Sequence, residues 1–352
     1  MSKPFISGAA FGAALTATAI HPPDVIVKQM TFQNWRMVVT FLTASSTSTF
    51  LVNVLQRLGY LHLNPREYST LGIFGPLDGN IVGGLILGAG LTISGSCPGT
   101  VFAQIGAGIG SGFYTLGGGI LGGIIWSGFL RPALRGRAKP STETSDDKSY
   151  HLALDKWAGI SHLGALFAVE TLFISAIATI VHLASPGSSG LVGPVTGGIL
   201  IAGAQMVSIV ARKSLLGTSS SFEEVGDYFW WVLGQRDKPK SYSAIALTIG
   251  MIAGALAVSL ASPSTHTMTN VTIKPIRAIL GGVLLAVGSR MAGGCTSGHG
   301  ISGISLLSIS SFVTVAAMFA GGAGVASIMG SKVVSLAYLS QKIKRINLPK
   351  PA

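Results

Sequence analysis

The chain has 352 residues, of which 48% are hydrophobic and 10% are charged, and its mean hydropathy is +0.59. Soluble globular domains carry about 25% charged residues, so this composition excludes an ordinary soluble fold and favours a membrane protein. The net charge of +12 is explained better by basic loops that orient membrane helices than by nucleic-acid binding, and a basic field also attracts anions. The 48 glycines do not recur at every third position, which excludes collagen, and membrane helices use glycine for close backbone contact.

Apolar stretches divide the chain into about nine predicted membrane segments. They cover residues 4–20, 36–56, 80–96, 112–130, 158–184, 190–211, 243–262, 276–294 and 309–329. Runs of about 20 apolar residues match the thickness of the bilayer core. The predicted fold class is therefore all-α integral membrane, with about nine membrane helices plus short half-helices in two internally repeated halves. No small-residue cleavage site precedes His21, so we expect the first segment to be retained rather than removed as a signal peptide.

Polar stretches set the predicted domain boundaries. The predicted units are a first transport repeat (1–135), a polar linker (136–156), a second transport repeat (157–331) and a basic C-terminal tail (332–352). The linker, the stretch 212–240 and the tail contain many Lys and Arg residues, whereas 263–273 contains no charged residue. The positive-inside rule then places the three basic stretches in the cytoplasm, and this favours two halves that run parallel. Inverted halves stay open as the alternative.

An internal self-match contains both cysteines of the chain. Residues 83–100 (GGLILGAGLTISGSCPGT) align without a gap on residues 281–298 (GGVLLAVGSRMAGGCTSG), at an offset of 198 residues. Cys97 falls on Cys295, and several glycines also coincide. Internal repeats are typical of secondary transporters, whose substrate sites lie near the bilayer midplane where broken helices meet.

Each cysteine ends an apolar helix and opens a turn that is rich in Gly, Ser and Thr. Such residues suit helix caps, so the pattern predicts half-helices over 98–107 and 298–308. Unpaired backbone at membrane depth survives only where it lines a cavity or is buried in protein, and the start of a half-helix offers free N–H groups to an anion. The predicted substrate-path residues are Cys97, Pro98, Gly99, Thr100, Cys295, Thr296, Ser297, Gly298 and His299.

The chemistry of the two thiols has several possible forms. A lone free cysteine is often only a small buried apolar residue, but two cysteines at matched helix starts favour a role in the path. Each thiol could hydrogen-bond an anion, exchange with a sulfane sulfur, or act only as a weak donor, and a disulfide between them stays open. His299 follows Cys295 by four residues, but the matching position of the first repeat is Val101, so a lining or capping role is favoured over a metal site. No metal or other cofactor is predicted.

Two further stretches carry weaker signals. Thr218 and Ser219 precede Glu223, so either could cap a helix, or the Ser/Thr cluster could line a vestibule. The aromatic run 228–231 fits a membrane interface. No GxxxxGK[ST] pattern is present, so ATP hydrolysis by this chain is not expected.

The motifs GSCPGT at 95–100, GGCTSGHGISG at 293–303 and LLGTSSSFEEVGDYFW at 215–230 resemble those of the YeeE/YedE sulfur-transport family. The resemblance covers nearly the whole chain apart from the linker and the tail. It implies an hourglass-shaped importer of thiosulfate whose central path contains Cys97 and Cys295. The bacterial thiosulfate importers of the family have a third cysteine in the first membrane segment, where this chain reads ALTATAIHP over 14–22.

These observations predict a transporter, not an enzyme, for a small sulfur-containing anion such as thiosulfate or a sulfide species. Its expected partners are the anion, the lipid bilayer and a downstream sulfur acceptor of unknown identity, and its expected location is the plasma membrane as a multi-pass protein. The alternative is a membrane sulfur carrier that forms a persulfide on Cys97 or Cys295, and a membrane scaffold without transport activity is a third possibility.

Overall fold

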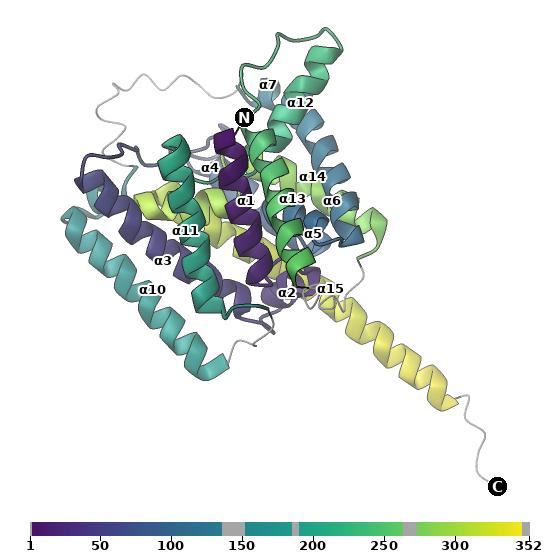
Figure 1. Cartoon of the computed structure of the whole chain (residues 1–352). Coiled ribbons are helices and arrows are strands. Elements are labelled where there is room, and N and C mark those ends of the chain that lie inside the picture. Colours follow the sequence, from purple (N-terminus) through teal and green to yellow (C-terminus); the bar gives the residue numbers. More distant parts are fainter. Residues whose placement is uncertain (1, 136–151, 185–189, 263–272, 347–352) are drawn as a thin grey trace.

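The computed structural model of the chain describes residues 2–135, 152–184, 190–262 and 273–346 (Figure 1). The described part is helical, and its only β contact is an isolated bridge between Ala153 and Ser308. The first half contains α1 (Ser2–Ala17), α2 (Pro23–Met30), α3 (Arg36–Arg57), α4 (Asp78–Ser94), α5 (Thr100–Gly106), α6 (Gly110–Ile125), η1 (Trp126–Leu130) and α7 (Arg131–Arg135). The remainder contains α9 (Leu154–Ala158), α10 (His162–Ala184), α11 (Pro194–Arg212), α12 (Ser220–Val232), α13 (Ser243–Ala261), α14 (Pro275–Met291), η3 (Thr296–Gly303), η4 (Ile304–Leu306) and α15 (Ile309–Ile346).

The chain is an all-α, multi-pass membrane protein. Six described helices are long and apolar enough to cross a bilayer, and α14 with the segment Thr296–Leu306 forms a seventh candidate that is bent by 41° at its break. Each of the nine predicted apolar segments contains a helix, but the count of nine membrane helices is not confirmed. The reason is length, because α1 and α4 have 16 and 17 residues and a full crossing needs about 20.

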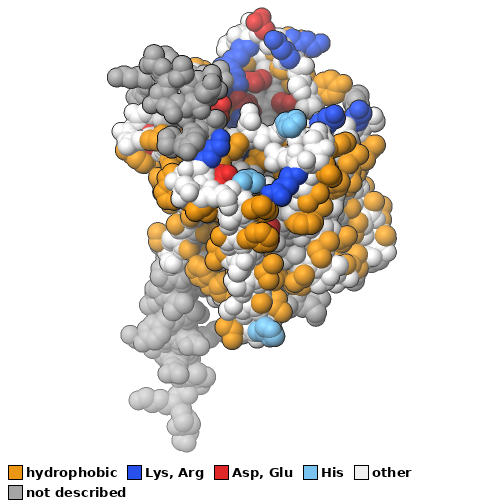
Figure 2. Space-filling model, turned by 90° about the vertical axis from the view of Figure 1, so that its left-hand side faces the viewer, with side chains coloured by type: hydrophobic (Ala, Val, Ile, Leu, Met, Phe, Trp, Pro, Cys, Tyr) orange, Lys and Arg blue, Asp and Glu red, His pale blue; other side chains and the backbone are white. Residues whose placement is uncertain are grey.

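The surface of the molecule agrees with a membrane setting. Hydrophobic side chains cover the flank seen in Figure 2, whereas most charged side chains gather at one end. Helix α10 exposes large hydrophobic side chains, among them Phe167, Leu172 and Ile174. We call the end that carries α7 and α12 the α12 face, and the opposite end, which carries α2, the α2 face (Figure 1).

The two halves are inverted repeats, so the expectation of parallel halves is wrong. The equivalent helices α4 and α14 run antiparallel, because Gly83 approaches Ala292 while Gly90 approaches Leu285. Likewise α11 begins where α1 ends, with the Leu191 N–H donating to the Ala17 carbonyl at 3.0 Å. The packing partners exchange in the same way: α1 packs on α13 as α11 packs on α3, and α4 packs on α15 as α14 packs on α6. Inverted repeats of this kind build many secondary transporters.

The positions of the linker and the tail explain why the charge count misled. Helix α7, which leads into the linker, lies at the α12 face, whereas α15 continues without a break to Ile346 and ends beyond the α2 face (Figure 1). The two basic stretches therefore leave from opposite ends of the molecule. The end of the linker is also bound to the fold, since the Leu154 N–H donates to Leu307 O at 2.8 Å and the Ile309 N–H to Leu152 O at 3.1 Å.

Glycines let the helices of the centre approach one another closely. A Cβ added at Gly83 would lie 2.3 Å from the Ala292 nitrogen, and one at Gly288 would lie 2.5 Å from the Leu87 nitrogen. Helices α1 and α13 meet in the same manner, with an added Cβ at Gly12 only 2.1 Å from the Met251 carbonyl oxygen. Close backbone contact of this kind is how membrane helices gain van der Waals energy without a hydrophobic driving force.

Candidate functional site

Repeat-equivalent glycines break the two central helices. Gly95 ends α4 with a φ of 61°, and Gly293 follows α14 with a φ of 79°. Side chains with a Cβ rarely adopt this left-handed conformation, so glycine suits both positions. Each glycine lies two residues before a cysteine, and the chain beyond it turns into a short helix. The predicted half-helices are therefore present as α5 and as η3 followed by η4, and η3 is a π-helix, a form found frequently at functional sites.

Alanine substitutions at Gly95 and Gly293 should distinguish the cost of a left-handed backbone from the cost of a steric clash of the added Cβ. Gly293→Ala should lower stability by about 1–2 kcal/mol, the cost of a left-handed alanine, because the nearest atom to its Cβ is the Ser69 Cβ at 3.7 Å. Gly95→Ala should cost more, since its Cβ would also lie 2.8 Å from the Pro23 Cβ. Thermal unfolding of the detergent-purified variants should rank wild type above Gly293→Ala above Gly95→Ala. The reverse order of the two variants would contradict the close contact between Gly95 and α2.

Cys97 is folded into the start of α5. The Thr100 N–H donates to Cys97 Sγ at 3.2 Å, and the Cys97 N–H donates to Thr100 Oγ1 at 2.7 Å. The side chain is buried, with 6% of its surface exposed, and the thiol is free. Because Sγ already accepts a hydrogen bond from the backbone, its S–H proton remains available to another acceptor.

Cys295 is surrounded by hydroxyl groups. Its Sγ lies 3.3 Å from Ser297 Oγ and 3.4 Å from Thr218 Oγ1, and the backbone N–H groups of Gly298 and Thr218 also point at the sulfur. The thiol is free and 1% exposed. Thr218 therefore faces Cys295 rather than capping α12, which begins without a side-chain cap bond. Of the two expectations for this cluster, lining the site describes Thr218 better.

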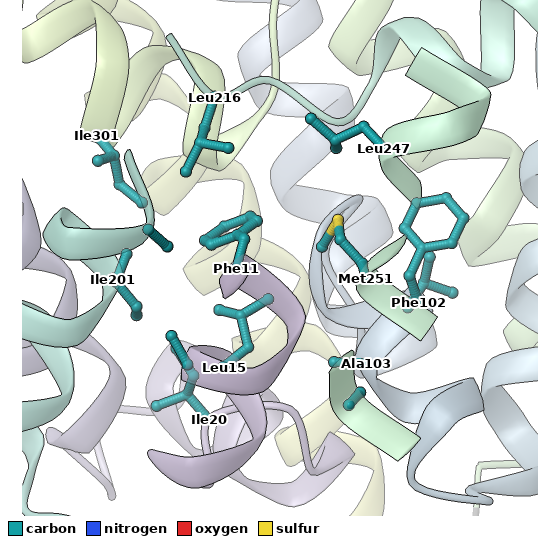
Figure 3. Close-up of a cluster of buried hydrophobic side chains, with 14 of the residues drawn as sticks. Phe11, Leu15, Ile20, Phe102, Ala103, Ile201, Leu216, Leu247, Met251 and Ile301 are labelled. Atoms are coloured by element: carbon teal, nitrogen blue, oxygen red, sulfur yellow. The ribbon is translucent and has the colours of Figure 1, made fainter. Parts of the chain in front are cut away.

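A small cavity of about 30 Å³ lies between the two halves. This space exceeds the roughly 10–15 Å³ that a single water molecule needs. An added Cβ at Gly99 would lie 3.8 Å from both Cys97 Sγ and Thr218 Oγ1, so the surroundings of the two thiols meet there. Most of the wall is apolar and belongs to the core cluster around Phe11 and Leu15 (Figure 3). The lining residues are Phe11, Leu15, Ile20, Met37, Thr40, Phe41, Ala44, Cys97, Gly99, Thr100, Ile201, Thr296, Ser297 and Ile301.

The predicted path residues fall into two groups. Five of them line the cavity, namely Cys97, Gly99, Thr100, Thr296 and Ser297. Pro98, Cys295, Gly298 and His299 are buried beside it without lining it. His299 holds the break together, because its Nδ1 lies 2.9 Å from Ser311 Oγ and its Nε2 lies 3.0 Å from the Ala292 carbonyl oxygen. With both ring nitrogens engaged, a capping role describes this side chain better than a base or a metal ligand.

Repeat-equivalent side chains also clamp the segments that precede α2 and α12. Gln104 Nε2 donates to His21 O at 2.7 Å and to Gly95 O at 2.9 Å, and its Oε1 accepts from Ser96 Oγ at 2.6 Å. Ser302, which is 198 residues further along, donates to Leu216 O at 2.6 Å. Both side chains are completely buried. Each half therefore fixes its broken helix to the segment that contributes Ile20 or Thr218 to the site.

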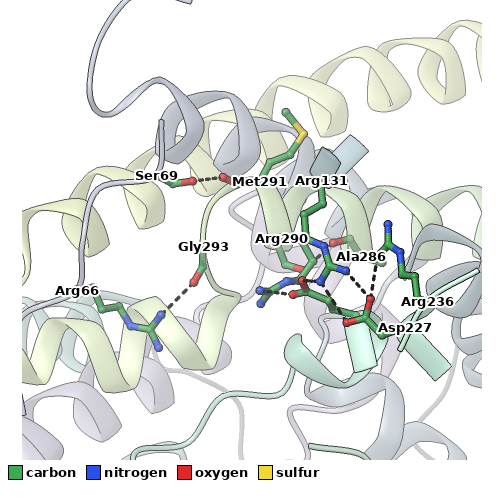
Figure 4. A network of polar contacts seen from close by, with 11 residues as sticks. Arg66, Ser69, Arg131, Asp227, Arg236, Ala286, Arg290, Met291 and Gly293 are labelled. Atoms are coloured by element: carbon green, nitrogen blue, oxygen red, sulfur yellow. Dashed lines mark hydrogen bonds and ion pairs between the residues drawn. The ribbon is translucent and has the colours of Figure 1, made fainter. Parts of the chain in front are cut away.

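An ion-pair network joins three helices at the α12 face (Figure 4). Arg131 binds Glu223 at 2.6 Å and Asp227 at 2.6 Å, and Arg290 also pairs with Glu223. Burial by itself would raise the pKa of the Glu223 carboxyl, but the charge of Arg290 and the hydrogen bond from Arg131 hold that pKa below its usual value. A second cavity of about 190 Å³ lies here, lined by Ser69, Thr70, Leu71, Trp126, Arg131, Leu134, Glu223, Arg290 and Met291.

One charged residue of the site was not predicted from the sequence. Arg66, in the connection between α3 and α4, donates from Nη1 to the Gly293 carbonyl oxygen at 3.1 Å. Its own backbone is held by Ser308 and Ser310. No periodic pattern marks this connection, and its partners are more than 200 residues away in sequence, so no local signal was available.

These features define the class of the protein. Inverted repeats, a broken helix in each half and a cavity between the breaks are features of many membrane transporters. The chain belongs to the sulphur transport family, because the model of that family matches residues 20–324.

Individual relatives point in the same direction. A protein of Spirochaeta thermophila described as "Thiosulfate transporter TsuA" is 24% identical over 293 residues, which are 74% of this chain and 78% of the relative. A "Probable transporter" in each of two strains of Xylella fastidiosa is 31% identical over 137 residues, 39% of this chain and 93% of the relative. These two relatives are thus less than half as long as this chain, about the size of one of the predicted repeats.

Proposed function

We propose that the chain transports thiosulfate or a closely related small sulfur anion across the plasma membrane, without acting as an enzyme. The path would run through the cavity, with Cys97 on one side and Cys295 on the other. The observation that carries the proposal is the placement of two free, buried thiols at equivalent breaks of antiparallel helices, beside a single cavity. The relationship to TsuA of Spirochaeta thermophila supports thiosulfate as the first substrate to test.

The donors beside the cavity suit a small anion. The hydroxyl groups of Ser297 and Thr218 lie next to Cys295 Sγ, and the backbone N–H of Thr100 donates to Cys97 Sγ. An anion that enters a narrow path loses water, and fixed donors must replace that water. The S–H groups would add two weak donors that also match a polarisable sulfur atom.

The cavity is narrow and mostly apolar, and this favours a conformational change during transport. Its volume is only about 30 Å³, and the side chains around it would restrict the passage of a hydrated anion. Phe11, Leu15 and Ile201 from the facing helices α1 and α11 would have to separate to admit it. We interpret the structure as a state in which the path is constricted between the two helix breaks.

Uptake of ³⁵S-thiosulfate into proteoliposomes tests the proposal. Cys97→Ala and Cys295→Ala should each reduce the initial rate at low thiosulfate concentration by about twofold to tenfold, because a weak hydrogen-bonding group contributes about 0.5–1.5 kcal/mol. Thr248→Ala is the matched control, since it removes a buried hydroxyl from α13 that bonds only to the carbonyl of Ile245 in its own helix. Wild-type rates in both cysteine variants would contradict the thiol path. No uptake by folded wild type, together with a persulfide on either cysteine, would favour the sulfur-carrier alternative.

A further inference from the structure

Arg66 is a charged side chain beside the Cys295 break. Its side chain packs against three glycines of that segment. An added Cβ at Gly294 would lie 3.0 Å from Arg66 Nη1, one at Gly298 would lie 3.4 Å from Nη2, and one at Gly303 would lie 2.9 Å from Cδ. The same Gly298 Cβ would lie 3.8 Å from Cys295 Sγ. The guanidinium and the thiol therefore flank the same glycine.

The backbone of Arg66 is fixed on both sides. Its N–H donates to Ser308 Oγ at 2.8 Å, and its carbonyl oxygen accepts from Ser310 Oγ at 3.1 Å. Both serines belong to the chain that follows the break. The connection between α3 and α4 is thus tied to the second repeat at this residue, which holds the guanidinium at the break rather than in open solvent.

The charge of Arg66 is not neutralised by a carboxylate of the described residues. Its hydrogen bond within that part of the chain goes to the carbonyl of Gly293, which uses one of the five N–H donors of the guanidinium. The other arginines nearby are different, since Arg131 and Arg290 both hold Glu223. Figure 4 shows Arg66 and this network on opposite sides of the segment from Met291 to Gly293. Arg66 therefore keeps a full positive charge and unused donors beside Cys295.

We infer that Arg66 selects a sulfur oxyanion at the Cys295 end of the path, by receiving the oxygen atoms of the anion on its guanidinium while the sulfur end faces the thiol. This inference rests on the proposed transport function and narrows its substrate class. A guanidinium donates two parallel hydrogen bonds to a pair of oxygens, and this pattern fits a sulfonate-like group but not hydrosulfide. The path should accordingly prefer thiosulfate over sulfide species.

The first test is the concentration dependence of thiosulfate uptake into proteoliposomes. Arg66→Gln should raise KM by about tenfold to a hundredfold, the loss expected when a charge-assisted hydrogen bond is removed. Arg66→Lys keeps the positive charge but cannot donate two parallel hydrogen bonds to one anion. Its KM should therefore lie between those of wild type and Arg66→Gln. Arg57→Gln is the matched control, because Arg57 is an exposed arginine at the end of α3 in the same connection. Its KM should stay at the wild-type value.

The second test does not depend on transport. In a Cys97→Ser background Cys295 is the only cysteine, and its alkylation by iodoacetate and by iodoacetamide can be followed by mass spectrometry. The neutral reagent reports the reactivity of the thiol, and the ratio of the two rates reports attraction of an anion to it. Arg66→Gln should lower the iodoacetate to iodoacetamide ratio about tenfold, and Arg57→Gln should leave the ratio unchanged.

The outcomes of the two tests distinguish the proposed transport of thiosulfate from the proposed role of Arg66. If wild type fails to take up thiosulfate but Arg66→Gln still lowers the alkylation ratio, the proposed substrate is wrong and the role of Arg66 stands. If uptake is robust and Arg66→Gln changes neither KM nor the ratio, Arg66 has only a structural role and the inference is overturned. Failure of both reagents to reach Cys295 would also overturn it, because Arg66 would then border no path to the thiol.

Discussion

Gly118→Ala should destabilise the protein strongly, whereas Gly117→Ala should not. Both glycines lie in α6, but an added Cβ at Gly118 would lie 2.0 Å from the Ile279 carbonyl oxygen of α14, whereas one at Gly117 would meet open space. A methyl group at residue Gly118 cannot be accommodated unless α6 and α14 move apart. Overpacking of a tight core costs about 1–3 kcal/mol and sometimes more, and we expect the upper end because the obstacle is backbone.

Thermal unfolding and size-exclusion profiles in detergent would measure this difference. Gly117→Ala is the matched control, because it makes the same chemical change one residue away, and alanine favours a helix over glycine by about 1 kcal/mol. A similar loss of stability in both variants would mean that a factor common to both positions, such as contact with lipid, rather than the α6–α14 contact, decides the result. The equivalent contact of α4 with α15 should show the same sensitivity at Gly88, whose Cβ would collide with the Met318 carbonyl oxygen.

The features that follow a local pattern could be predicted from the sequence. The self-match located both helix breaks, because a left-handed turn needs glycine and so leaves Gly95 and Gly293 at matched positions. Apolar length located the helices, since burial in lipid requires it. The length of the apolar segments did not distinguish helices that cross the whole bilayer from the shorter helices α1 and α4. Those two helices lie among other helices and need not span the bilayer by themselves.

The orientation of the repeats could not be predicted from charge. The number of Lys and Arg residues assigns a loop to one side of the membrane only when the number of membrane crossings between the loops is known. The breaks after α4 and α14 and the short lengths of α1 and α4 made that number uncertain. The contact between Gly83 and Ala292 settles the direction of α4 relative to α14, and it depends on three-dimensional packing that no count of charges contains.

The site residues that were not predicted share a cause. Gln104 and Arg66 bind partners that are distant in sequence, namely His21 for Gln104 and Gly293 for Arg66. Gln104 had one available signal, because it lies 198 residues before Ser302, in register with the repeat. The two residues differ in identity, but both are polar and occupy equivalent positions of the repeat. Gln104 donates to a carbonyl oxygen of the segment before α2, and Ser302 donates to one of the segment before α12.

Gln104→Leu should disable the Cys97 side of the site more completely than any substitution of a cavity-lining hydroxyl. Leucine has a similar size but leaves three buried partners without Gln104: the carbonyl oxygens of His21 and Gly95 and the hydroxyl of Ser96. An unsatisfied buried polar group costs about 1–3 kcal/mol, so we expect a combined loss of about 3 kcal/mol or more. The loss would fall on the loop that holds Cys97 against α2.

Two measurements would distinguish local loosening from general unfolding. In a Cys295→Ser background, Gln104→Leu should speed the alkylation of Cys97 by iodoacetamide at temperatures where the helix content is unchanged, and thiosulfate uptake by the folded fraction should fall. Gln56→Leu is the matched control, because Gln56 makes one hydrogen bond, to Leu63 O at 2.9 Å, at the partly exposed end of α3. That variant should lose about 1 kcal/mol and leave Cys97 protected. Unchanged alkylation in Gln104→Leu would mean that the turn from Gly95 to Thr100 holds its shape through its own backbone bonds, and that the clamp to His21 is dispensable for the site.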